Sequence, residues 1–458
     1  MYRKRAVNSG NLDHTTQERG SIMITLRRVI FTVTMIISLG AANVSYSADF
    51  LSQIHPYLTL SEEYSDNLHL TKHDRKEDFM TTVRPGVRFS NMDEHSGIEL
   101  DASAGYVFHA HYENLDYLTA NVDFNARYMN LYGFNFYLRN SFIRDDDPRE
   151  REIFSTSADN RYLLGRETER RVYLRNVIEP VVEYQFGRES RAGVRYRNNY
   201  YHDKDTHVGG VAIDNDSVEN TVNPFLTVWL TQMHGVSADY SYTNGHFRSQ
   251  PDLNGHRVGG SYMLRFSPRA TAFIRGAYTS QLFTEKEHNY DIYDAAAGLT
   301  YAFSPSLTVS AEAGCFWMNP RIGENQSGVT FRADLTQLEG RTTYRLGIQG
   351  GYTQDYFTSQ NLGFRKYYRA TGSITHQLER RLSVGLLGSI EYAKTENAPP
   401  EPKEKDIMWN AGANIAYTPF RWLRIALDYR YQQLSANTYY DLNEYKEHRV
   451  ILSATATY

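Results

Sequence analysis

The last eleven residues of this 458-residue chain, His448 to Tyr458, read "HRVILSATATY" and decide its fold. Successive side chains of a β-strand point to opposite faces, so alternate residues of this stretch share one face. The apolar face carries Val450, Leu452, Ala454, Ala456 and Tyr458. A chain end normally frays in water unless a neighbouring element holds it. The sequence therefore predicts that another strand pairs with this one.

The same alternation recurs through the chain. Every second residue is apolar from Ile98 to Phe108, from Leu118 to Tyr128 and from Leu423 to Tyr431. The positions between them include Glu99, Asp123 and other charged or polar residues. Each predicted strand thus has one polar face, which is typical of strands that present alternate residues to lipid.

The links between the predicted strands also alternate, in length. Short links occur near residues 91–96, 129–130, 187–189, 267–269, 304–306, 379–380 and 418–420, and longer charged or Gly/Asn/Pro-rich links near 71–77, 143–170, 202–216, 285–289 and 395–405. Short turns at one end and long loops at the other indicate an up-and-down meander. Most segments reach the roughly 9 to 11 residues that a tilted strand needs to cross a bilayer, and we expect about 20 strands, within a range of about 16 to 22.

The predicted fold class is therefore all-β, a transmembrane antiparallel up-and-down β-barrel in which the last strand pairs with the first and leaves no edge. A soluble β-solenoid or large β-sandwich is the alternative. It is disfavoured because one sheet of this size has no second layer to bury the outward apolar residues.

Composition narrows the function. The chain has 36 Tyr, 22 Phe and a formal net charge of −4, so it is a poor candidate for binding nucleic acid. Its single cysteine, Cys315, excludes an intramolecular disulfide framework and falls on an apolar strand face, as expected of a small lipid-facing residue.

The N-terminus has the order of a secretory signal. Arg27 and Arg28 precede an apolar run from Val29 to Ala42, and small residues follow. We interpret residues 1–47 as a leader and signal peptide, with Met23 as a candidate true start, and residues 48–458 as one barrel domain. The paired arginines leave twin-arginine export as an alternative. Export of a barrel predicts the outer membrane of a Gram-negative bacterium as its location.

Three stretches near the start carry a narrower resemblance: Pro56-Tyr57, residues 63–68 (EYSDNL) and residues 78–86 (DFMTTVRPG). They resemble the opening of the β-barrel porin type 2 family, whose members include outer-membrane proteins found with exopolysaccharide and exosortase systems. The resemblance implies an outer-membrane barrel for polysaccharide passage. It supplies no catalytic residues.

Charged residues on the polar faces are the candidate functional site. The predicted pore-lining residues are Arg84, Arg88, Glu99, Asp101, Asp123, Arg127, Arg139, Arg175, Asp239, Arg275, Glu312, Arg332, Asp334, Arg345, Arg369, Arg424, Asp428 and Arg430. Charges that line a pore set its ion selectivity. The alternative is that cross-strand arginines and carboxylates only neutralise one another. We also expect Val450, Leu452, Ala454, Ala456 and Tyr458 to act as the signal that the barrel-assembly machinery reads.

Other chemistry has weaker support in the sequence. Tyrosines in or near loops could stack on sugars, namely Tyr200, Tyr201, Tyr439, Tyr440 and Tyr445, but packing explains them equally. Acidic loop residues, namely Asp145, Asp146, Asp147, Asp214 and Asp216, lack the spacing of a calcium loop. His109, His111 and Ser103 form no local triad. We therefore expect no enzyme, no catalytic residue, no metal and no cofactor.

The predicted function is an aqueous channel in the outer membrane, for polysaccharide or another hydrophilic solute. The alternative is a structural or adhesion barrel with an occluded lumen and partner-binding loops. Expected partners are outer-membrane lipid, the barrel-assembly machinery and polysaccharide-export components, and not nucleic acid. The longest loop, residues 143–170, is expected to fold inward and narrow the pore.

Overall fold

The computed structural model describes residues 53–129, 132–147, 170, 172–203, 206–208, 211–213, 216–248, 250–356, 363–395, 404–437 and 444–458. The predicted signal peptide lies outside these residues. The contacts separate Met1–Gln53 from Ile54–Tyr458, and the second unit is the barrel. No helix in the described part of the chain is long and apolar enough to cross a membrane.

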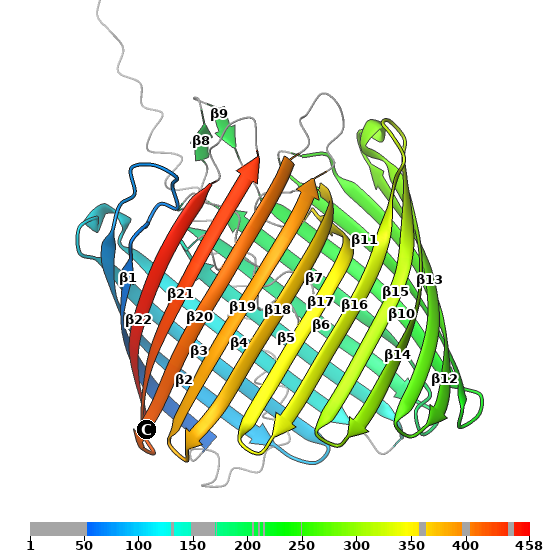
Figure 1. Cartoon of the computed structure of the whole chain (residues 1–458), viewed down its shortest axis with the longest axis horizontal. Coiled ribbons are helices and arrows are strands. Elements are labelled where there is room, and N and C mark those ends of the chain that lie inside the picture. The colour runs from blue at the N-terminus through cyan, green and yellow to red at the C-terminus, as the bar shows by residue number, and fades with distance from the viewer. Residues whose placement is uncertain are drawn as a thin grey trace, which may run out of the picture. The chain divides into compact units, whose positions relative to one another are not determined.

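Twenty strands of the described chain form one closed antiparallel sheet (Figure 1). They are β1 (Ile54–Ser65), β2 (Asp78–Met92), β3 (Ser96–His109), β4 (Tyr117–Met129), β5 (Phe134–Asp145), β6 (Tyr173–Gln185), β7 (Arg191–Asp203), β10 (Ser217–Trp229), β11 (His234–Phe247), β12 (Leu253–Ser267), β13 (Ala270–Phe283), β14 (Tyr290–Ser304), β15 (Leu307–Pro320), β16 (Gln326–Glu339), β17 (Thr342–Asp355), β18 (Gly363–Glu379), β19 (Leu382–Thr395), β20 (Glu404–Phe420), β21 (Leu423–Asn437) and β22 (Tyr445–Thr457). A separate hairpin joins β8 (Thr206–Val208) to β9 (Val211–Ile213), and short 3₁₀ turns cover Glu113–Leu115 and Lys286–His288.

The C-terminal strand closes the barrel. β22 pairs with β1 from Tyr57 opposite Thr457 to Ser65 opposite Arg449. The backbone N–H of Tyr458 then donates to the carbonyl of Pro56 at 2.9 Å. The predicted fold class, with a last strand that pairs with the first, is confirmed.

The outer face of the barrel is apolar in three bands. Aliphatic side chains are exposed at mid-height, including Leu60, Val83, Ile274, Leu299, Ile348 and Leu386. Exposed aromatic rings lie toward the loop side, including Phe108, Tyr242, Tyr293, Trp317 and Trp409, and toward the turn side, including Tyr128, Phe134, Tyr184, Phe303, Tyr417 and Phe420. Aromatic girdles around an aliphatic band are the arrangement of a transmembrane β-barrel.

The wall of the barrel splits between β16 and β17. Their ladder runs only from Phe331 opposite Gly350 to Glu339 opposite Thr342. β17 nevertheless continues its pairing with β18 as far as Asp355 opposite Gly363. The split begins at Gly350-Gly351, where Gly351 has a φ of +154° that side chains rarely adopt.

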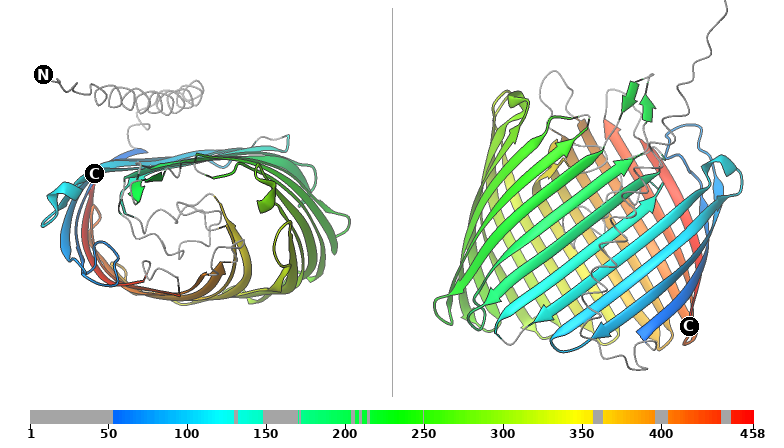
Figure 2. Two further views of the ribbon diagram at one scale, coloured as in Figure 1. Left: turned by 90° about the horizontal axis from the view of Figure 1, so that it is seen from above. Right: turned by 180° about the vertical axis from the view of Figure 1, so that it is seen from behind.

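Beyond this point, residues 351–355 of β17 and their partners 363–367 of β18 separate from β16 and bend into the lumen, while β18 stays paired with β19 from Arg365 onward (Figure 2). We call these residues the inner hairpin. Its Tyr352 hydroxyl donates to Asp294 of β14 at 3.1 Å, and Gln354 contacts Gln281 of β13. The face of β17 that points outward at Leu346 and Ile348 therefore packs, from Tyr352 onward, against the inside of β13 and β14.

An apolar cluster fixes the inner hairpin in place. The buried side chains are Phe247, Leu253, Phe283, Tyr290, Ile292, Phe316, Met318 and Phe364, with Tyr352 and Tyr356 packed against them. They come from β11 to β15, from the inner hairpin and from Tyr356, which follows β17. This cluster lies inside the barrel near the loop side, so the lumen is narrower there than the strand count alone implies.

Candidate functional site in the barrel lumen

Strand register places the predicted pore-lining residues on the lumen-facing side of the wall. They alternate with outward-facing residues, as Arg275 does with the exposed Ile274 and Arg345 does with the exposed Leu346. Of the predicted assembly signal, Val450, Leu452 and Tyr458 are exposed on the outer face, at 38%, 51% and 96%. Whether the first set lines a conducting path, and whether the second set is read during assembly, stay predictions.

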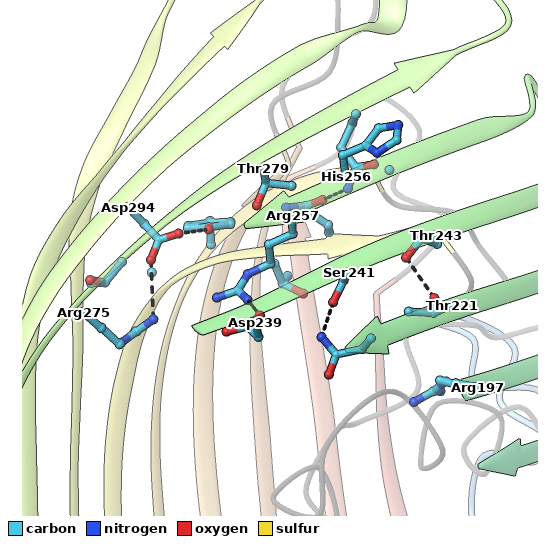
Figure 3. A pocket seen from close by; sticks show the side chains of 18 of the residues that line it. Arg197, Thr221, Asp239, Ser241, Thr243, His256, Arg257, Arg275, Thr279 and Asp294 are labelled. Atoms are coloured by element: carbon cyan, nitrogen blue, oxygen red, sulfur yellow. Dashed lines mark hydrogen bonds and ion pairs between the residues drawn. The ribbon is translucent and has the colours of Figure 1, made fainter. Parts of the chain in front are cut away.

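A cavity of about 890 Å³ occupies the lumen beside the inner hairpin (Figure 3). It is lined mainly by strands β6 to β18. Hydroxyl and amide side chains supply much of its surface: Thr221 and Thr243 lie 2.8 Å apart through their hydroxyls, and Asn223 donates to Ser241 at 2.8 Å. The ring faces of Phe225, Phe331, Tyr352 and Tyr367 complete the lining.

The charged groups of this cavity are mostly paired with one another. Arg257 donates to Asp239 at 2.6 Å. Arg275 binds Glu312 and also lies 3.4 Å from Asp294. Arg197 lies 3.1 Å from Glu179 and 3.7 Å from Glu219. The cavity is therefore strongly polar but nearly neutral.

Arg195 is the exception among the cavity arginines. No carboxylate of the described chain lies within ion-pair distance of its guanidinium, which sits 5.8 Å from the centre of the Phe225 ring. An exposed cation beside an aromatic face can bind a polar ligand by hydrogen bonds while the ring covers an apolar face.

Other predicted lining residues also form pairs. Arg88 donates to Asp101 at 2.8 Å, Arg332 donates to Asp334 at 2.6 Å, and Arg369 binds Glu391 of the neighbouring strand. Arg175 is 2% exposed and donates to Asn199 at 3.0 Å. For Arg88, Arg332 and Arg369 the alternative interpretation, mutual neutralisation inside the barrel, describes the geometry.

A second group of predicted arginines has no such partner. Within the described residues, no carboxylate forms an ion pair with Arg84, Arg139, Arg345, Arg424 or Arg430. Arg139, Arg345 and Arg424 are exposed and lie one to five residues from the turn-side ends of their strands. The turn side of the lumen therefore carries positive charges in contact with water.

Buried ion pairs lie at the loop side of the lumen. Arg449 of β22 lies 3.5 Å from Glu63 and 3.3 Å from Asp147, which follows β5. Because β1 to β4 separate β22 from β5, Asp147 reaches across the inside of the wall. Arg170 lies 2.9 Å from Asp146 and donates to the Leu68 carbonyl at 3.0 Å.

Burial raises the pKa of Asp146 to about 6, and the nearby charge of Arg170 opposes that rise. Residues 148–169 of the predicted inward-folding loop lie outside the described residues. Its described ends, at Asp146, Asp147 and Arg170, are held inside the loop-side mouth.

Several lumen residues escaped the sequence prediction, namely Arg257, Asp294, Arg365 and Asp406. Alternation could have found them, because Val258, Tyr293 and Ile407 beside them are exposed on the outer face. Arg365 and Asp406 are 3.4 Å apart on strands that are not neighbours. No local pattern in the sequence indicates such a contact.

Several of the tyrosines and acidic residues considered as sugar or calcium ligands have structural roles instead. Tyr201 is 1% exposed and stacks on Tyr173, whereas Tyr445 is 2% exposed and packs with Leu70 and Met408. Asp216 pairs with His202 at 2.8 Å. Tyr439, Tyr440 and Asp214 lie outside the described residues. The described residues contain no group of three His, Cys, Asp or Glu side chains that could hold a metal ion.

Neither a protein-family model nor a curated protein sequence matches the chain, so the narrow resemblance to the porin type 2 family is not confirmed. Solved structures do match. A ferric enterobactin receptor mutant from Pseudomonas aeruginosa, in complex with enterobactin, aligns at a TM-score of 0.51 and 7% identity over 89% of this chain and 81% of that one. The siderophore receptor PirA from Acinetobacter baumannii aligns at 0.50 and 6% identity over 88% and 80%. OccK5 of Pseudomonas aeruginosa aligns at 0.44 and 11% identity over 89% and 99%. The first two likenesses support the transmembrane barrel fold.

Proposed function

We propose that this protein is an outer-membrane channel of a Gram-negative bacterium that passes a hydrophilic solute of the neutral oligosaccharide class. The observation that carries the proposal is the 890 Å³ lumen cavity, which combines hydroxyls, amides, paired charges and aromatic ring faces. Sugar hydroxyls form hydrogen bonds with such polar groups, and the apolar faces of sugar rings lie against aromatic rings. A nearly neutral lining favours neutral sugars over strongly charged ones.

The fold is consistent with this role. A barrel of 16 to 18 strands already encloses an aqueous channel, and this barrel has more strands. Polysaccharide, as implied by the resemblance near the start of the chain, is the longer form of the same solute class. We expect no enzymatic activity, because the proposed role requires binding and passage only.

A structural or adhesion barrel is the second candidate, and one observation favours it. The loop-side mouth contains buried pairs such as Arg449 with Glu63 and Asp147, together with the inner hairpin. A mouth packed in this way occludes the lumen unless something moves. In that case the surface loops bind an external partner and the lumen conducts nothing.

Single-channel conductance of the refolded protein in a planar bilayer tests the proposal. Open steps that maltohexaose reduces, and that a matched acidic oligosaccharide reduces less, are the expected result. Arg257→Gln provides a cavity variant, because it removes the partner of Asp239 and should weaken the block by the neutral sugar. Thr59→Val, a lumen-facing change on β1 outside the cavity, is its control. Folded, inserted protein that never opens would favour the occluded barrel.

A further inference from the structure

The split between β16 and β17 leaves part of β16 as a sheet edge. Residues 326–330 pair with β15, from Met318 opposite Gln326, but have no ladder partner on the β17 side in the described chain. The inner hairpin lies inside this edge and touches it through Lys366, whose ammonium donates to Gln326 at 2.8 Å. We call the line between this edge and the inner hairpin the seam.

The seam reaches membrane depth. Ser327 is the register partner of Trp317, which is 49% exposed in the loop-side aromatic girdle. Val329, two residues further into the wall, is 58% exposed on the outer face. Unpaired backbone groups do not face hydrocarbon without a polar partner, because lipid tails cannot satisfy their hydrogen bonds. A polar group must therefore cover this edge.

The lumen cavity extends to the seam. Its lining includes Thr330, Phe331 and Gly350 as well as the polar residues of the interior. Phe331 belongs to the outer face, since its ring stacks at 6.0 Å on Tyr368, which is 44% exposed there. One cavity is thus lined both by lumen-facing polar side chains and by a ring of the lipid-facing surface.

We propose that the seam is a lateral binding site for a lipid-like amphiphile. The polar head occupies the lumen cavity, where Arg195 and the neutral hydroxyls and amides bind it. The hydrocarbon chain passes beside Phe331 and Val329 to the aliphatic band of the outer surface. The head group also supplies hydrogen-bond partners to the edge of β16. This inference does not depend on whether the barrel conducts solutes.

Photo-cross-linking tests the proposal. The full barrel is reconstituted in vesicles that contain a phosphatidylcholine with a diazirine near the carbonyl end of one chain, and cross-linked peptides are mapped by mass spectrometry. The expected result is labelling of lumen-side residues at the seam, such as Thr353 and Gln349, in addition to residues of the outer face. Labelling confined to outward-facing residues would overturn the site.

Two tryptophan variants identify the route of entry. Thr330→Trp places a bulky ring at the seam and should abolish labelling of the cavity while outer-face labelling persists. Thr59→Trp changes another half-buried lumen-facing threonine, on β1, and should leave cavity labelling intact. Heat-modified mobility in detergent gels reports whether each variant folds. Cavity labelling that survives in Thr330→Trp would show entry through a mouth of the barrel and would refute the lateral route.

Discussion

The two ends of the lumen use the same kinds of side chain in different ways. Toward the loop side, ion pairs are nearly dry: the side chains of Arg369 and Glu391 are 8% and 10% exposed. Toward the turn side, Arg332 and Asp334 form a pair whose side chains remain 45% and 40% exposed, and Arg345 and Arg424 have no acidic partner in the described chain.

This difference in exposure arises from tertiary packing between elements, and not from the pattern within any single strand. At the loop side, the inner hairpin and the ends of the β5–β6 connection fill the lumen and exclude water from the charges. At the turn side the described connections are short and leave the wall side chains in water. We therefore expect changes at the loop side to affect mainly stability, and changes at the turn side to affect mainly ion selectivity.

The largest expected effect is the loss of a dry pair. Glu391→Ala leaves the guanidinium of Arg369 buried without its carboxylate, and we expect the free energy of unfolding to fall by about 3–5 kcal/mol. Asp334→Ala, at the wet Arg332 pair, is the matched control and should cost less than about 1 kcal/mol. Urea unfolding of the refolded barrel measures both. Equal losses would show that the two ends do not differ in the way proposed.

The inner hairpin gives the next prediction. Phe364 is 4% exposed, with its ring 5.6 Å from that of Tyr352 and 5.9 Å from that of Phe316. Phe364→Ala should cost about 3 kcal/mol by leaving a cavity, and should loosen the inner hairpin so that single-channel conductance rises. Leu346→Ala, which changes an exposed residue on the outer face of β17, is the control. A conductance unchanged in Phe364→Ala would mean that the hairpin does not limit the pore.

The pH dependence of stability tests the loop-side mouth. Because the pKa of Asp146 is raised to about 6 from an ordinary value of 3.8, the folded state holds a proton there that the unfolded state has lost. The bound proton therefore stabilises the folded state by ~3 kcal/mol below pH 4, and this contribution is lost as the pH rises through about 6. Asp146→Asn should remove this dependence.

Unfolding measured between pH 4 and pH 7 provides the readout for that prediction. The carboxyl of Asp74, whose side chain is 83% exposed, gives the comparison, since Asp74→Asn should leave the pH dependence as in the unmodified protein. Parallel curves for the unmodified protein and Asp146→Asn would contradict the placement of Asp146 in a buried site.

Most of the fold could be predicted from the sequence because it depends on a local pattern of period two. The apolar face of residues 448–458 indicated a pairing partner, which is β1. The facing of Arg275 or Arg345 followed from the same alternation. Predicted turns were correct to within a few residues, although β20 continues through Phe420, where the sequence suggested a turn at 418–420.

The partners of the lumen charges could not be predicted in the same way. Arg275 and Glu312 lie on strands two apart, and Tyr352 reaches Asp294 only because β17 leaves the wall. Such contacts depend on barrel curvature and on a ladder that stops part-way, and alternation carries no information on either. The Gly350-Gly351 pair was the one local signal of the split.

Ion selectivity gives the smallest expected effect and bears on the turn side alone. Arg139, Arg345 and Arg424 have no carboxylate partner in the described chain, so their field reaches the pore and should favour anions. A charge in water acts on an ion 4 Å away by about 1 kcal/mol, and salt screens charges at larger distances. We therefore expect the permeability ratio to change by roughly two- to fivefold when all three become glutamine. Reversal potentials in a potassium chloride gradient measure this ratio.

Arg332→Gln is the control and should shift the ratio less than the change of any unpaired arginine does, because Asp334 already balances its charge. An equal shift from Arg332→Gln would mean that pairing at the wet end of the lumen does not screen its arginines.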